Sequence, residues 1–281
     1  MYENFFSRAN PGLVIFMIDQ SASMSQIGYE GRPLAETAAD IVNNMVLDMS
    51  MIFPRGSTIR MNAHIAIIVY GGRGPLGDVE LIRYGFIDEI VQSPIRTEVI
   101  KRKYYADEIG FYEIEIEKPI IIEPNYGYLP NMTFAYQLAH ALINDWKERC
   151  CEDNHHSSLT PSPIVINITK GTNIGNDEEL LNLSNQIKNI EFEDGNPLIV
   201  SILIPTHPSC FDSLSLPTQK LFDVNLRDWE TICLSSSNVP EELIDTFIEG
   251  GFTDVSQESK LLFVNPDNTV KARIIDCLIG R

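Results

Sequence analysis

Three oxygen-bearing side chains at alternate positions form the stretch of this sequence best suited to chemistry. Asp19, Ser21 and Ser23 directly follow an unbroken apolar run, Leu13 to Ile18. One carboxylate and two hydroxyls in a short loop are hard oxygen ligands of the kind that Mg²⁺ and Mn²⁺ prefer in proteins. The alternative role for such a loop is to form a turn that caps the next helix. The spacing indicates a candidate site for a divalent cation.

The apolar run must position this loop. A short continuous apolar segment between turn residues is typical of a strand buried on both faces, as in a parallel sheet. In open α/β sheets, ligands bind beyond the carboxyl ends of the strands. The sequence therefore predicts a buried first strand that delivers the polar loop to that end of the sheet.

The rest of the chain alternates between strand-like and helix-like patterns. The predicted strands span 61–70, 163–169, 197–204, 231–236 and 261–265, and the predicted helices span 34–51, 134–149, 177–189, 240–250 and 269–279. Residues 73–128 are rich in β-branched, aromatic and alternating residues, which predict strands or ribbons rather than helices. We therefore expect one α/β domain over residues 1–281, with a doubly wound, mainly parallel sheet and a β-rich edge insertion at about 73–128.

The charge of the chain bounds its partners. Its 281 residues carry a formal net charge of −18. This acidity argues against nucleic-acid binding, which needs clustered Lys and Arg, and against anionic membranes. We see no apolar signal segment at the start and no run that could span a membrane, so we expect a cytoplasmic protein with reduced cysteines.

The D-x-S-x-S pattern after a buried strand resembles the metal-ion-dependent adhesion site of the von Willebrand factor A (vWA) family. In that family a threonine of a second loop completes the hydroxyl set, and Thr133 in LPNMTFAYQLAHAL stands at the matching place. The resemblance implies a vWA fold and a metal site formed by Asp19, Ser21, Ser23 and Thr133. It also implies a protein partner, whose acidic side chain completes the shell of a bound Mg²⁺ or Mn²⁺.

Other stretches are closest in style to bacterial cytoplasmic vWA proteins of tellurium-resistance and stress-type gene clusters. They are FMIDQSASM, the turn Asp194-Gly195-Asn196 and the ending LFVNPDNTVKARIIDCLIGR. This resemblance implies a place in a bacterial stress or signalling assembly.

Lys170 departs from the family pattern. The strand PIVINIT is followed in the family by an aspartate that supports the metal, but here the letters are Ile168-Thr169-Lys170-Gly171. One carboxylate then remains where the family has two, and an ammonium beside a divalent ion is repelled. Either Lys170 turns to solvent and leaves a weakened oxygen site, or its ammonium pairs with Asp19 in place of the metal. We favour the pairing, because the flexible stem can reach Asp19 and the ammonium donates three hydrogen bonds.

Other candidate residues are expected to have ordinary roles. Cys150-Cys151 and His155-His156 suggest a ligand cluster, but adjacent cysteines rarely bind one zinc ion, so a polar loop is favoured. His64 and His140 are expected to be packed or exposed rather than catalytic. Asp177 is expected to be a helix-start residue. Glu113, Glu115 and Glu117 are expected to form the solvated face of a strand.

Three functions stay open from the sequence. The first is a non-catalytic protein-interaction module with a degenerate adhesion site. The second is a metal-dependent phosphohydrolase that uses Asp19 and the motif serines, and the third is a structural scaffold subunit without an ion. We favour the first, because the chain has no G-x-S-x-G elbow or P-loop and the sequence places no histidine to activate the serines.

Overall fold

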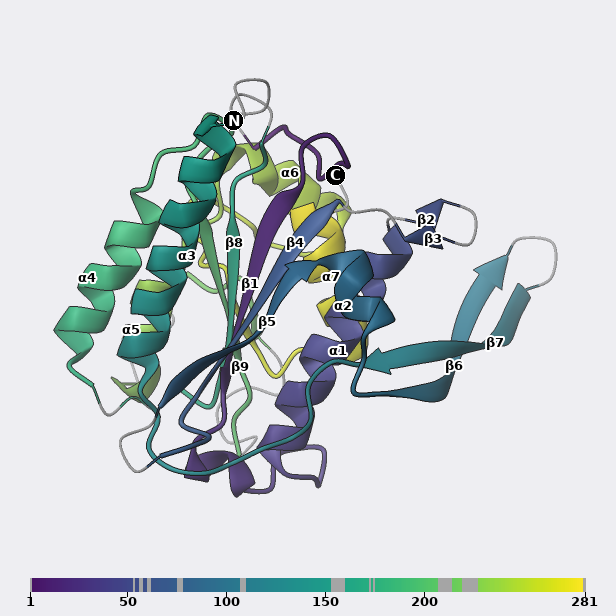
Figure 1. Cartoon of the computed structure of the whole chain (residues 1–281), viewed down its shortest axis with the longest axis horizontal. Coiled ribbons are helices and arrows are strands. Elements are labelled where there is room, and N and C mark those ends of the chain that lie inside the picture. The colour runs from purple at the N-terminus through teal and green to yellow at the C-terminus, as the bar shows by residue number, and fades with distance from the viewer. Residues whose placement is uncertain are drawn as a thin grey trace.

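A computed structural model of the protein describes residues 2–52, 54–55, 58–59, 62–74, 78–106, 110–152, 160–171, 173, 175–206, 214–218 and 227–279. Its centre is a seven-stranded sheet with the strand order β10-β11-β9-β8-β1-β4-β5 (Figure 1). The strands are β1 (Gly12–Asp19), β4 (Ala63–Tyr70), β5 (Val79–Phe86), β8 (Ile164–Thr169), β9 (Leu198–Leu203), β10 (Leu214–Ser215) and β11 (Leu262–Val264). The five inner strands run parallel, and the edge strands β5 and β10 run antiparallel to their neighbours.

Helices cover both faces of this sheet. Figure 1 shows α3, α4 and α5 on one side and α1, α2 and α7 on the other. The helices are α1 (Leu34–Ile52), α2 (Ile87–Gln92), α3 (Met132–Glu152), α4 (Asp177–Lys188), α5 (Arg227–Ser235), α6 (Ile244–Glu249) and α7 (Asn268–Ile279), with short 3₁₀ turns η1 (Ala22–Ser25) and η4 (Glu241–Leu243). The predicted fold class, a doubly wound and mainly parallel α/β sheet, is confirmed.

β1 is apolar throughout because each of its faces lies in a different core. Val14, Phe16 and Ile18 pack with the side chains of α1 and α7, whereas the alternate residues pack with those of α3. All eight residues of the strand are buried. This double burial explains why the run does not alternate with polar residues.

The sheet reverses its winding at β1. The chain passes from β1 through α1 to β4 on one side, and it later adds β8 on the other side. Such a reversal opens a crevice at the carboxyl ends of the strands, which is where doubly wound folds bind ligands. β1 ends there at Asp19 and β8 ends there at Thr169.

The insertion contains three strands and one helix. β5 is the edge strand of the main sheet, and β6 (Arg96–Ala106) and β7 (Gly110–Ile120) form a separate antiparallel ribbon that projects from the body (Figure 1). A short pair, β2 (Pro54–Arg55) and β3 (Thr58–Ile59), also lies outside the main sheet. The strands in 73–128 were predicted, and so was the exposed acidic row on β7.

Two predicted assignments are wrong. Residues 87–92 form α2 rather than strand, because Ile87 and Ile90 are buried at helical spacing and Glu89 accepts a hydrogen bond from the Phe86 N–H. Residues 231–235 belong to α5 rather than to a strand. The helix begins at Arg227, upstream of Thr231, and it buries Ile232 and Cys233 in the core beside the sheet. Among the described residues, no helix is both long and apolar enough to cross a membrane.

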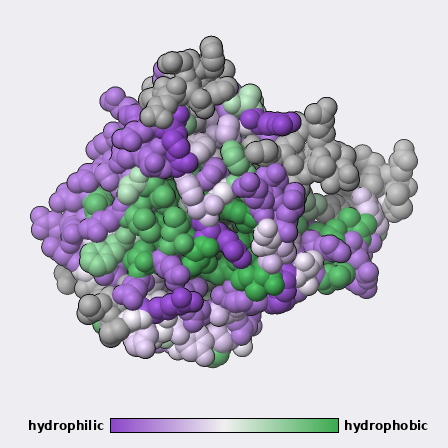
Figure 2. Space-filling view, in the orientation of Figure 1, coloured by the Kyte–Doolittle hydropathy of each residue, from purple (hydrophilic) through white to green (hydrophobic). Residues whose placement is uncertain are grey.

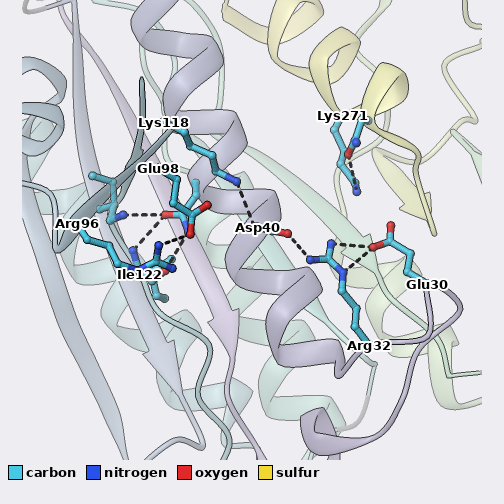
Figure 3. A network of polar contacts seen from close by, with 11 residues as sticks. Glu30, Arg32, Asp40, Arg96, Glu98, Lys118, Ile122 and Lys271 are labelled. Carbon is cyan, nitrogen blue, oxygen red and sulfur yellow. Dashed lines mark hydrogen bonds and ion pairs between the residues drawn. The ribbon is translucent and has the colours of Figure 1, made fainter. Parts of the chain in front are cut away.

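Ion pairs tie the ribbon to α1 and to the loop after η1. Asp40 of α1 lies between Lys118 of β7, at 3.1 Å, and Arg32, which also pairs with Glu30 at 2.7 Å (Figure 3). Burial raises the pKa of Asp40, but the Arg32 hydrogen bond and the Lys118 charge outweigh it and leave this pKa below its usual value. Arg102 of β6 adds a 2.6 Å pair with Asp48 of α1.

Candidate functional site

Asp19 lies fully buried at the carboxyl end of β1. The Ser21 N–H donates to Asp19 Oδ1 at 2.9 Å, and the Thr169 hydroxyl donates to Oδ2 at 3.0 Å. Burial raises the pKa of Asp19, and the hydrogen bonds from Ser21 and Thr169 oppose that rise. Among the described side chains no Lys, Arg or His forms an ion pair with this carboxylate. Its charge is therefore held by neutral donors alone.

The two motif serines lie next to each other in the loop that follows. Ser21 Oγ and Ser23 Oγ are 3.0 Å apart, with Ser21 buried and Ser23 half-buried. Ser21 stands at the N-cap position of η1, but its side chain makes no capping hydrogen bond. The role as a helix-capping turn therefore does not account for this hydroxyl.

Thr133 lies in the first turn of α3 and is 2% exposed. Its hydroxyl has no hydrogen-bond partner among the described residues. Gly175 packs directly over it, because a Cβ built on Gly175 would lie 2.5 Å from Thr133 Oγ1. A buried hydroxyl without a partner costs stability, so a ligand that uses its lone pairs would restore what the protein lacks.

A segment ahead of α3 holds the motif loop in place. The Gly127 N–H donates to Gln20 O at 2.9 Å, the Tyr128 N–H donates to Gly71 O at 2.6 Å, and the Ala22 N–H donates to Tyr128 O at 2.7 Å. Gly127 must be glycine at this crossing, because a Cβ there would lie 2.2 Å from the carbonyl oxygen of Gly72. We call these three backbone hydrogen bonds the clamp, and the sequence did not predict it.

Lys170 turns away from the buried carboxylate. Its ammonium donates to Gln26 Oε1 at 2.8 Å, in the exposed loop beyond η1. The predicted pairing of Lys170 with Asp19 is wrong. Neutral donors already satisfy both oxygens of Asp19, so an inserted ammonium would lose its hydration for little gain. The structure has the other arrangement that the sequence left open.

Exposed apolar side chains stand in the segments that adjoin the motif loop. They come from the loop after η1, from the segment that clamps the motif, and from the first turn of α3. Each is between 48% and 57% exposed: Ile27, Tyr29, Tyr126, Tyr128, Leu129 and Phe134. Large apolar side chains gathered on a surface mark interaction sites more often than scattered ones do. We call these six residues the apolar collar.

The other sequence candidates that lie within the described residues form no second site. Asp177 is exposed in the first turn of α4, which Asn176 caps, as expected for a helix-start residue. The His155-His156 pair lies outside the described residues, and so does the side chain of Cys151. Within the described part of the chain, no group of three or more His, Cys, Asp and Glu side chains could hold a metal ion.

His64 is packed in an aromatic cluster, as the sequence suggests. Its ring lies 4.4 Å from Tyr84, 5.0 Å from Phe86 and 5.4 Å from Trp146, measured between centroids. Burial, with a smaller contribution from the charge of Arg149, lowers the pKa of His64 to about 4. The ring is therefore neutral near pH 7 and has a structural role.

Replacing His64 by phenylalanine is expected to reduce the loss of stability in mild acid. In the unfolded chain a histidine titrates near 6.5, so between that pH and about 4 the unfolded state binds the extra proton. Stability therefore falls as the pH drops, and the wild type should lose about 2 kcal/mol through His64 between pH 7 and pH 5. Urea unfolding at both pH values measures this loss. Phe86→Leu is the control, since it loosens the same cluster and keeps the wild-type slope; an equal loss in His64→Phe would contradict the assignment.

Comparisons with known proteins give distant structural likeness only. No protein-family model matches the chain, and no curated protein matches it. The vWA domain of SpRpn10 has 11% identity and a TM-score of 0.36, over 71% of this chain and 78% of that one. The manganese-loaded TRAP protein of Plasmodium vivax has 15% identity and a TM-score of 0.34, over 70% of this chain and 58% of that one.

A third solved structure contains the three N-terminal domains of the type V pili tip protein Mfa5 from Porphyromonas gingivalis. It has 13% identity and a TM-score of 0.34, and the match covers 58% of this chain and 20% of that one. The chain thus spans about a fifth of the solved Mfa5 chain and little more than half of the solved TRAP chain. Likeness at these TM-scores is too distant to assign a family or a function.

Proposed function

We propose that this chain is a non-catalytic protein-interaction module of the vWA type, with a degenerate metal-ion-dependent adhesion site. One observation carries the proposal: the buried carboxylate of Asp19 has no charged partner among the described residues, and it lies at the carboxyl end of β1, where the sheet reverses its winding. Hydroxyls stand in the same loop, and the residues of the apolar collar belong to the segments that adjoin it. This arrangement suits recognition of a partner that brings both charge and apolar surface.

The oxygen set fits Mg²⁺ or Mn²⁺. Asp19 would supply the anionic ligand, and the hydroxyls of Ser21, Ser23 and Thr133 would supply neutral ones, with water in the remaining positions. The unpartnered Thr133 hydroxyl supports this assignment, because it lacks the bond that a cation would provide. Because Lys170 stands in place of a second carboxylate, only the single negative charge of Asp19 would face the two positive charges of the cation. We infer weak cation binding.

A bound cation would offer a coordination position to a carboxylate of the partner, as the vWA resemblance implies. The Lys170 ammonium, which donates to Gln26 just beyond η1, adds a second positive group near the motif loop. We therefore propose a partner whose acidic side chain reaches the motif loop. The likeness in sequence style to bacterial cytoplasmic vWA proteins is the support for placing it in a stress or signalling assembly.

Retention of a partner that depends on both Asp19 and Mg²⁺ tests the proposal. Proteins captured from an extract on the wild type in Mg²⁺ should be lost in EDTA and reduced at least about 10-fold on Asp19→Ala, as loss of a buried charge contact implies. Asp177→Ala is the matched control, because it removes an exposed carboxylate and should retain the partner. Capture that survives both EDTA and Asp19→Ala would favour a scaffold. Turnover of p-nitrophenyl phosphate that is lost in Asp19→Ala would favour a phosphohydrolase.

A further inference from the structure

A cleft of about 420 Å³ opens beside the motif loop, at the edge of the sheet. On the face seen in Figure 2, hydrophobic surface gathers at the centre of the view, where β5 and α3 lie in Figure 1. The apolar lining of the cleft comes from β4, β5 and the segments on either side of the ribbon: Val69, Ile82, Ile95, Ile122 and Pro124. β5 ends the sheet, so no further strand of the described chain closes this side.

A pair of carboxamides forms the polar end of the cleft. Gln20, between Asp19 and Ser21, is 7% exposed, and its Oε1 accepts a hydrogen bond from Asn125 Nδ2 at 3.2 Å. The pair packs over Gly72, where a Cβ would lie 2.5 Å from Gln20 Oε1 and 2.9 Å from Asn125 Nδ2. Only glycine leaves room for both amides at this point.

The carboxamide pair keeps one donor nitrogen and one acceptor oxygen available. Among the described residues, neither Gln20 Nε2 nor Asn125 Oδ1 has a hydrogen-bond partner. If both amides are flipped, the oxygen of Gln20 and the nitrogen of Asn125 take these two roles instead. A donor nitrogen beside an acceptor oxygen matches a peptide group, which offers a carbonyl oxygen and an N–H.

Each charged side chain in the lining of the cleft is in an ion pair. Arg73 pairs with Glu80 at 3.4 Å on one wall. On the other wall Glu123 pairs at 2.7 Å with Arg96, which lies outside the lining and also pairs with Glu98. A rim of paired charges neither attracts a phosphate nor demands a charged side chain. The cleft is thus complementary to a neutral, apolar segment.

We propose that this cleft binds an extended, uncharged segment of the partner protein. One peptide group of that segment lies on Gln20 and Asn125, and an apolar side chain lies among Ile82, Ile95 and Ile122. The inference rests on the proposed function, since Gln20 directly follows Asp19 in the motif loop. A partner that places a carboxylate at Asp19 brings its neighbouring residues to this cleft.

The side-chain amide signals of Gln20 and Asn125 in ¹⁵N NMR spectra test the inference. The probe is N-acetyl-leucine N-methylamide, which carries two peptide groups and one apolar side chain. Both signals are expected to shift and saturate, with a Kd on the order of 1 mM, as for other ligands of this size. The alcohol 3-methyl-1-butanol has a similar apolar chain and no peptide group, and it should bind at least about 5-fold more weakly.

Gly72→Ala should abolish these shifts, because the new Cβ displaces the carboxamide pair. Gly85→Ala on β5 is the matched control, since its Cβ would lie 3.1 Å from a flexible Glu89 oxygen outside the cleft, and it should bind as the wild type does. Equal shifts with the alcohol, unchanged binding in Gly72→Ala, or no shift in the wild type would overturn the inference.

The titration is run without metal, so it separates this inference from the proposed function. The probe should still bind to Asp19→Ala, because the cleft residues are intact in that variant. A positive titration together with capture that is independent of Asp19 would support the cleft and refute the adhesion site. A negative titration together with capture that depends on Asp19 would support the adhesion site and refute the cleft.

Discussion

Lys170→Asp is expected to tighten Mn²⁺ binding about 10- to 100-fold, the range over which residues that support metal ligands act. The substitution removes a positive charge from the end of β8 and adds the carboxylate that the vWA pattern has at this position. Asp19 and the three hydroxyls stay as they are, because Lys170 makes its side-chain bond to Gln26 and none to Asp19. Calorimetric titration of Mn²⁺ into both proteins measures the change.

Lys101→Asp is the control for this prediction. Lys101 is exposed on the ribbon, so this variant changes the net charge equally, away from the motif loop. It should alter Mn²⁺ affinity less than about 2-fold in 0.15 M salt, where distant charges are screened. Equal gains in both variants would mean that bulk charge accounts for the effect. If neither the wild type nor Lys170→Asp binds Mn²⁺, the motif loop has a structural role only.

Asn43→Ala is expected to destabilise the fold by about 3–5 kcal/mol. The Asn43 carboxamide is 2% exposed on α1; its Oδ1 accepts from the Ile121 and Ile122 N–H groups at 2.8 and 3.2 Å, and its Nδ2 donates to Ile122 O at 2.9 Å. Truncation leaves three buried backbone groups without partners, at about 1–3 kcal/mol each before relaxation. Urea unfolding measures the loss.

The matched control for this prediction is Asn185→Ala, on the exposed side of α4. A helix-surface substitution of this kind should change stability by less than about 0.5 kcal/mol. Because Asn43 fixes the start of the segment that carries Asn125, Asn43→Ala should also weaken binding of the peptide probe. A loss of stability in Asn43→Ala as small as that in Asn185→Ala would contradict the role assigned to the Asn43 carboxamide.

The sequence predicted most of the sheet because its inner strands are buried on both faces. The run Leu13 to Ile18 is wholly apolar, and the run Ile164 to Thr169 is polar only at Asn167 and Thr169. Turn residues bound both runs. The assignment was wrong at 87–92 and 231–235, where short β-branched runs carry no length signal and tertiary packing decides between helix and strand. The single-domain prediction stays a prediction.

The candidate site was predictable only in part. The alternate spacing of Asp19, Ser21 and Ser23 is local, so the sequence shows it directly. The bonds from Thr169 to Asp19 and from Lys170 to Gln26 join residues about 150 positions apart, and no local pattern encodes which acceptor a long side chain chooses. The clamp at Gly127 likewise depends on backbone contacts between three separate segments.

Anomalous diffraction at the manganese edge, from crystals of the wild type grown with Mn²⁺, tests the central claim most directly. The claim is that the Asp19 loop still holds a divalent cation because Lys170 has turned away. We expect an anomalous peak coordinated by the oxygens of Asp19, Ser21, Ser23 and Thr133, with the Lys170 ammonium still on Gln26. No peak at this loop, with the ammonium of Lys170 on Asp19, would contradict the claim.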